Sequence, residues 1–155
     1  MTRTSAGLLV YRCSGDGLQV LLVHPGGPLW AKRDEGAWSV PKGEVDEGDR
    51  PEATAAREFE EELGHSPPRG EWIDLGEVMQ TRKRVLAWAV EGDLDAENVR
   101  SNTFEMQWPP RSGHRVQFPE VDRAAWFEPE SAIGKLVPAQ RAFIARLVAH
   151  FDATR

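Results

Sequence analysis

The most informative segment of the chain reads Arg57-Glu58-Phe59-Glu60-Glu61-Glu62-Leu63-Gly64. On a helix, residues three and four positions apart share one face, so Glu58, Glu61 and Glu62 converge opposite a buried side. Like charges stacked in this way destabilise a helix unless a cation neutralises them, and Mg²⁺ takes carboxylate and water oxygens as ligands. The spacing alone also fits a solvated acidic surface, so it leaves both interpretations open.

The helix that carries these carboxylates is predicted over residues 51–63. Pro51 suits a first helical position, and Gly64 suits the cap after the last turn. Ala55, Ala56, Phe59 and Leu63 form its apolar side, whereas Arg50 is a poor N-cap residue.

The segment in front of this helix favours a ligand site over a plain acidic surface. Residues 41–49 read Pro41-Lys42-Gly43-Glu44-Val45-Asp46-Glu47-Gly48-Asp49 and lead directly into the helix. Gly43 and Gly48 permit backbone conformations that other residues resist, and they let main chain come close to a ligand. Each glycine alone would indicate only a turn, but with the carboxylates they predict a seat for a metal-bound phosphate.

The combined segment, residues 43–65, resembles the Nudix box of the Nudix hydrolases. The matching positions are Gly43, Arg57, Glu58, Phe59, Glu61, Glu62 and Gly64. Two positions depart from the pattern: Asp49 stands where the family has glutamate, and His65 stands where an apolar residue is usual. Asp49 keeps the negative charge on a shorter side chain, and His65 concerns packing rather than chemistry.

The rest of the chain alternates β-rich and helical segments. Two apolar runs, Ala6–Arg12 and Leu18–Val23, flank Ser14-Gly15-Asp16-Gly17 and predict a hairpin. The further expected strands are Trp72–Met79, Arg84–Glu91, Phe104–Trp108 and Ala124–Phe127, and a second helix is expected over Pro138–Phe151. These elements indicate a mixed α/β protein, and the resemblance implies one Nudix domain over residues 1–155: an α/β/α sandwich around a mixed β-sheet.

The resemblance also implies roles for the residues of the box. Glu58, Glu61 and Glu62 are expected to hold Mg²⁺ or Mn²⁺, with the backbone carbonyl of Lys42 as a further ligand. Arg57 is expected to orient a box glutamate through a salt bridge. Glu58 is the first choice for the group that accepts a proton from the attacking water.

One more carboxylate is expected from outside the box. Glu120 precedes the Trp126-containing strand and resembles the late glutamate that many family members use as a fourth ligand or an alternative base. Glu105 is the rival for this role.

Substrate contacts are harder to infer from the sequence. The candidates for phosphate binding are Lys32, Lys42, Arg82, Lys83, Arg84 and the backbone at Gly43, although Thr81-Arg82-Lys83-Arg84 also fits a charged hairpin turn. Trp30 and Trp108 stand in loop-like surroundings and could stack on a base.

Composition narrows the class of protein. The chain has 155 residues, of which 40% are hydrophobic and 28% charged, with a net charge of −6. An excess of acidic residues argues against non-specific binding to nucleic acid, which requires basic residues to neutralise the phosphates. No segment is long and apolar enough for a membrane span or a secretory signal, and Cys13 is the only cysteine. We expect a cytoplasmic protein with a nucleotide as its partner, as a monomer or a homodimer.

The resemblance predicts an enzyme that hydrolyses a pyrophosphate bond in a nucleoside diphosphate linked to another group, with Mg²⁺. The run Trp38-Ser39-Val40-Pro41-Lys42-Gly43 resembles a sequence of diadenosine and diphosphoinositol polyphosphate hydrolases. It favours dinucleoside polyphosphates or NTPs as substrates. The alternative is a Nudix-fold module that binds a nucleotide without cleaving it, for which Asp49 is the one support.

Overall fold

The computed structural model of the chain describes residues 3–15 and 17–153, so Asp16 of the expected turn and the ends of the expected domain lie outside the described residues. Its elements follow one another as β1 (Arg3–Ser14), β2 (Gly17–Pro25), β3 (Lys42–Glu44), α1 (Pro51–Leu63), β4 (Ile73–Gln80), β5 (Lys83–Glu91), β6 (Thr103–Gln107), β7 (Arg115–Pro119), β8 (Val121–Phe127), α2 (Pro129–Lys135), the 3₁₀ turn η1 (Pro138–Gln140) and α3 (Arg141–Ala153).

The main sheet is mixed. Its strands lie in the order β4-β5-β1-β2-β8, and β3 pairs with the first half of β1. Strands β1 and β5 run parallel, whereas the other pairs of this sheet are antiparallel. The predicted hairpin over β1 and β2 is confirmed.

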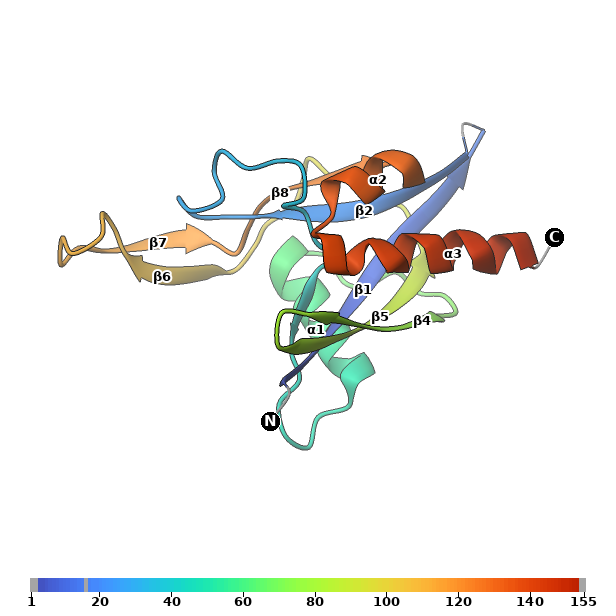
Figure 1. The fold of residues 1–155 in the computed structure, drawn as a ribbon, viewed down its shortest axis with the longest axis horizontal. Helices are drawn as coiled ribbons and strands as arrows, with labels where there is room; N and C mark the ends of the chain where they lie inside the picture. Colours follow the sequence, from blue (N-terminus) through green and yellow to red (C-terminus); the bar gives the residue numbers. More distant parts are fainter. Residues whose placement is uncertain (1–2, 16, 154–155) are drawn as a thin grey trace.

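Helices cover both faces of this sheet. Phe143, Ile144 and Leu147 of α3 are buried in one apolar cluster, while Phe59 and Leu63 of α1 are buried in a second cluster on the opposite face. Figure 1 shows α2 and α3 in front of the sheet and α1 behind it. The α/β/α sandwich expected from the sequence is therefore confirmed. None of the helices that the structure describes has the length and apolar character needed to cross a membrane.

The position of strand β5 between two apolar clusters explains why its sequence is apolar on both faces. Val85, Ala87 and Ala89 are buried in the cluster beneath α3, while Trp88 and Val90 contact the cluster beneath α1. Successive side chains of a strand point to opposite faces, so a central strand needs apolar residues at every position.

Strands β3 and β7 and helix α2 are not among the predicted elements. Strand β3 has three residues and lies in the segment expected to be a loop. In β7 only Val116 and Phe118 mark an apolar face, and α2 buries only Ala132, so both patterns are too short to indicate an element. The last helix was expected from Pro138, but the chain first makes the 3₁₀ turn η1 and begins α3 at Arg141.

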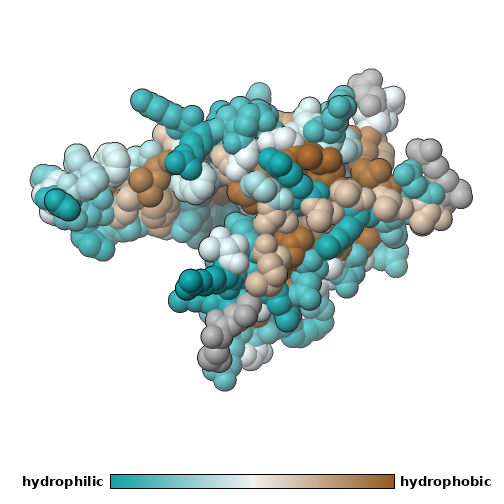
Figure 2. Space-filling model, viewed as in Figure 1, coloured by the Kyte–Doolittle hydropathy of each residue, from teal (hydrophilic) through white to brown (hydrophobic). Residues whose placement is uncertain are grey.

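Strands β6 and β7 form a separate two-stranded sheet. This hairpin projects from the body of the molecule (Figure 1), and apolar side chains gather on it among polar ones (Figure 2). Its cross-strand pairs include Phe104 with Phe118 and Met106 with Val116, so its apolar residues share one face.

Candidate active site

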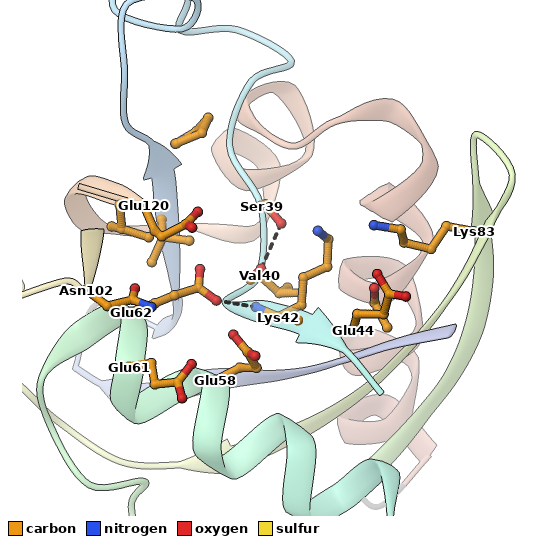
Figure 3. Close-up of a pocket in the computed structure, with 15 residues that line it drawn as sticks. Ser39, Val40, Lys42, Glu44, Glu58, Glu61, Glu62, Lys83, Asn102 and Glu120 are labelled. Carbon is orange, nitrogen blue, oxygen red and sulfur yellow. Dashed lines mark hydrogen bonds between the residues drawn. The ribbon is translucent and has the colours of Figure 1, made fainter. Parts of the chain in front are cut away.

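Helix α1 presents the acidic residues because both of its ends are fixed as the sequence predicts. Pro51 occupies its first turn, Arg50 makes no side-chain cap, and Gly64 closes the helix with a left-handed φ of 73°. Phe59 is fully buried against the sheet. The Glu58, Glu61 and Glu62 side chains therefore leave the helix toward the segment at Lys42 and Gly43, as Figure 3 shows.

These carboxylates line a cavity of about 540 Å³. Glu120, from the short connection between β7 and β8, faces them from the opposite side (Figure 3). Other lining residues are Ser5, Pro25, Ser39, Lys42, Gly43, Glu44, Lys83 and Asn102. The cavity thus combines four carboxylates of the expected site with two lysines, within the size range of small-molecule sites.

Burial shifts the protonation of the carboxylates nearest the sheet. Burial, and after it the charges of Glu58 and Glu120, raise the pKa of the Glu62 carboxyl to about 8, against the opposing charge of Lys42. The Lys42 backbone N–H donates a 3.0 Å hydrogen bond to Glu62 Oε2. The pKa of Glu58 is also raised, first by burial and then by Glu61, while Arg57 acts in the opposite direction.

Arg57 lies among three carboxylates. Its guanidinium nitrogens are 3.6 Å from Asp49, 3.7 Å from Glu58 and 3.7 Å from Glu61, measured to carboxylate oxygens. Asp49, which replaces the family's glutamate, therefore still reaches Arg57 despite its shorter side chain. Arg57 is not among the residues that line the cavity, but it pairs with Glu58 and Glu61, which do line it.

Gly43 is needed for a close approach rather than for a special φ. A Cβ placed on Gly43 would lie 2.0 Å from the carboxyl carbon of Glu58. Strand β3 is also held in place by pairing with β1, Gly43 opposite Ala6. Any side chain at position 43 would therefore displace Glu58 from the cavity wall.

A series of backbone hydrogen bonds holds Glu120 opposite helix α1. Asn102 N–H donates to the Glu61 carbonyl at 2.8 Å, Glu120 N–H donates to the Asn102 carbonyl at 2.9 Å, and Gly26 N–H donates to the Glu120 carbonyl at 2.9 Å. Glu105, the rival candidate, instead pairs with Arg115 on the projecting hairpin and does not line the cavity.

Only some of the candidate phosphate-binding residues lie at the cavity. Lys42 and Gly43 line the cavity, whereas Lys32 is exposed in a loop and Arg84 pairs with Glu77 at 2.7 Å outside it. Lys83, also one of the candidates, lines the cavity, and its neighbour Arg84 does not. Neighbouring residues of a strand point to opposite faces, and the sequence did not show which of the two faces this cavity.

Of the two candidates for base stacking, Trp30 lines a cavity near the carboxylates and Trp108 does not. Trp30 lines a second, smaller cavity of about 180 Å³ beside the first. Trp108 follows β6 at the start of the connection to β7, where a cis peptide bond joins it to Pro109. It lines neither of these two cavities.

The donor set of the main cavity fits a hard divalent cation. Carboxylate oxygens are the protein ligands that Mg²⁺ and Mn²⁺ prefer. Within the described residues, however, no three His, Cys, Asp or Glu side chains stand close enough to hold one metal ion as they are placed. The carboxylates surround the cavity without closing on a common point.

Comparison with known proteins identifies the family. The family model described as NUDIX domain matches residues 1–147. The chain belongs to the Nudix family. The family predicted from residues 43–65 is thereby confirmed, and with it the prediction of an enzyme that acts on phosphoric anhydride bonds.

Among curated Nudix relatives, an RNA pyrophosphohydrolase of Agrobacterium fabrum is 29% identical over 173 aligned residues, which cover 93% of each chain. An 8-oxo-(d)GTP phosphatase of Mycolicibacterium smegmatis is 31% identical over 72% of this chain but only 30% of its own length. An Ap4A hydrolase of C. elegans has the same fold, with a TM-score of 0.70 at 20% identity over 98% of this chain and 99% of that one.

Proposed function

We propose that this Nudix protein uses Mg²⁺ or Mn²⁺ to hydrolyse a pyrophosphate bond in a nucleoside diphosphate linked to a further group. The proposed substrates are dinucleoside polyphosphates or NTPs. The observation that carries the proposal is the convergence of Glu58, Glu61, Glu62 and Glu120 around one cavity, with Lys42 and Lys83 on its wall.

In this proposal the acidic side of the cavity holds the metal. Glu58, Glu61 and Glu62 supply carboxylate ligands, with the Lys42 carbonyl and Glu120 as further ligands. The bound ion would neutralise the pyrophosphate and lower the pKa of a coordinated water. Glu58 is the proposed proton acceptor, with Glu120 as the alternative. Arg57 is a positioning residue, because it contacts Glu58 and Glu61 rather than the cavity.

The basic side of the same cavity supports a substrate with several phosphates. The ammonium groups of Lys42 and Lys83 lie beside each other in Figure 3, and burial followed by the charge of Lys83 lowers the pKa of Lys42. The Ser5 hydroxyl, which is 1% exposed, has no hydrogen-bond partner in the described structure. Phosphate oxygens would pair with both ammonium groups and with this hydroxyl.

The proposal is tested by incubating the purified protein with Mg²⁺ and a panel of nucleotides and separating the products by chromatography. The panel contains NTPs, dNTPs, diadenosine polyphosphates, ADP-ribose, NADH and a diphosphoinositol phosphate. We expect cleavage of the polyphosphates, and loss of nearly all turnover in Glu61→Gln with the fold retained. Glu60→Gln, an exposed neighbour on the same helix, is the matched control and should stay active.

Two results would contradict this proposal. Full activity of Glu61→Gln would exclude the proposed metal ligands. Cleavage of ADP-ribose without cleavage of diadenosine polyphosphates or NTPs would overturn the substrate class. Binding of nucleotides without cleavage of any of them, with Mn²⁺ also tried, would favour the alternative of a Nudix-fold module that binds a nucleotide without cleaving it.

A second candidate substrate is the triphosphate end of an RNA, because the Agrobacterium relative is named an RNA pyrophosphohydrolase. The net charge of −6 argues against a general grip on a nucleic acid backbone. A short RNA with a 5′-triphosphate therefore belongs in the panel. A kcat/KM for this RNA far above that for the matching NTP would favour the second candidate.

A further inference from the structure

The smaller cavity, of about 180 Å³, adjoins the carboxylate cavity. The two share Pro25 and Glu120. The remaining lining comes from the loop after β2 and from strand β6: Gly26, Gly27, Pro28, Leu29, Trp30, Phe104 and Met106. A group that fills this side cavity can therefore continue past Glu120 into the main one.

Two adjacent glycines allow the loop and the projecting hairpin to meet at the side cavity. A Cβ on Gly27 would lie 2.9 Å from Cζ of Phe104, and a Cβ on Gly26 would lie 2.0 Å from the Pro119 carbonyl oxygen. Gly27 also has a φ of 94°, which favours glycine. The aromatic wall from β6 thus lies directly against the loop that carries Trp30.

Further contacts fix the side cavity relative to the carboxylates. Gly26 N–H donates to the Glu120 carbonyl, and Glu120 is tied through Asn102 to helix α1 by the backbone bonds described above. On the other side of the loop, buried His24 donates from Nε2 to the Arg33 carbonyl at 2.6 Å. The Arg33 guanidinium lies 5.4 Å from the centre of the Trp30 ring.

We propose that the side cavity binds the base of the substrate by contact with Trp30, Phe104 and Met106, without reading the base's hydrogen-bonding edge. This inference rests on the proposed function. The cavity is smaller than ordinary sites for a whole small molecule, its walls are apolar and aromatic, and Glu120 is its one ionisable residue. Stacking tolerates any base, because every base presents a flat π-face.

The expected effect is a rise in KM that depends on the presence of a base. Stacking of one base is worth about 1–3 kcal/mol, so Trp30→Leu or Phe104→Leu should raise KM for ATP about 5- to 150-fold with kcat little changed. Inorganic tripolyphosphate, which has no base, should inhibit ATP cleavage with the same Ki in wild type and variants. ATP, GTP, CTP and UTP should differ from one another by only a few-fold in the wild type.

Trp108→Leu is the matched control, because Trp108 belongs to the same β6–β7 hairpin as Phe104 but does not line the side cavity. It should leave KM for ATP unchanged. Circular dichroism shows whether each variant is folded, and Met106→Ala provides a second, smaller change in the same wall. Unchanged KM for ATP in folded Trp30→Leu and Phe104→Leu, or an equal rise in the Ki of tripolyphosphate, would overturn the base site. A preference above about 100-fold for one base would overturn recognition without its edge.

Failure of the proposed function can be separated from failure of the base site. If the wild type cleaves none of these compounds, calorimetric binding of ATP and of tripolyphosphate in the presence of Mg²⁺ makes the same comparison without turnover. Tighter binding of ATP that is lost in Phe104→Leu would support the base site even then. Equal binding of the two compounds would refute it.

Discussion

Replacing Glu62 with glutamine should stabilise the metal-free protein at alkaline pH while it abolishes turnover. The pKa of Glu62 is raised from 4.5 to about 8, chiefly by burial. The folded protein therefore holds this proton more tightly than the unfolded chain does. The resulting stability is fully present below about pH 4.5 and is lost as the pH rises through about 8.

The magnitude follows from the two pKa values of Glu62. At about 1.4 kcal/mol per pH unit, an ionised Glu62 costs the folded protein at most about 5 kcal/mol above pH 8. The attraction of the Lys42 ammonium is already part of this raised pKa, because it opposes the effect of burial. Relaxation of the site and entry of water reduce this cost, so we expect the unfolding free energy of the variant to exceed that of the wild type by about 2 kcal/mol at pH 8.5 and by less than about 1 kcal/mol at pH 5. The glutamine carbonyl can still accept the Lys42 backbone N–H that Glu62 accepts.

The assay is denaturant unfolding in EDTA at pH 5 and pH 8.5, with wild type, Glu62→Gln and the exposed control Glu60→Gln. The control should follow the wild type at both pH values. Added Mg²⁺ should stabilise the wild type at pH 8.5 more than Glu62→Gln. The reasoning is refuted if Glu62→Gln is less stable than the wild type at pH 8.5 in EDTA, or if the difference is the same at both pH values.

Three further substitutions test other parts of the site. Gly43→Ala should abolish most activity with little change in the helical circular dichroism signal, since its Cβ would lie 2.0 Å from the carboxyl carbon of Glu58; unchanged kcat would show that Glu58 need not stay in place. Arg57→Lys should lower kcat at least about 10-fold, because an ammonium lacks the planar fork that faces Asp49 and Glu58; full activity would exclude its positioning role. Phe59→Ala should cost about 3–5 kcal/mol of unfolding free energy in a denaturant titration, as Phe59 is fully buried beneath α1; a loss below about 1 kcal/mol would contradict this packing.

The acidic half of the site could be predicted because helical periodicity is local. Glu58, Glu61 and Glu62 fall on one face of α1 at a spacing that the sequence displays directly, and Gly64 marks where that helix ends. Glu120 is different, because backbone bonds from distant segments bring it to the cavity. Only the resemblance to the family indicated it in advance.

The basic residues of the main cavity and the aromatic residues of the side cavity could not be fully predicted, because their positions depend on strand pairing that the sequence does not display. Lys83 rather than Arg84 faces the main cavity, a choice set by how β5 starts beside β1. Phe104 and Met106 alternate with exposed polar residues along β6, as in any half-buried strand. The approach of Phe104 to Gly27 depends on where the hairpin lies, and in the partner strand β7 only Val116 and Phe118 indicate an apolar face.

The most direct test of the central claim is the turnover of a nucleotide panel by EDTA-treated protein as Mg²⁺ is added back. The account predicts no cleavage in EDTA, saturable recovery with Mg²⁺ or Mn²⁺, and almost no recovery in Glu61→Gln. Cleavage that persists in EDTA, or equal recovery in Glu61→Gln, would contradict a metal-dependent reaction at these carboxylates.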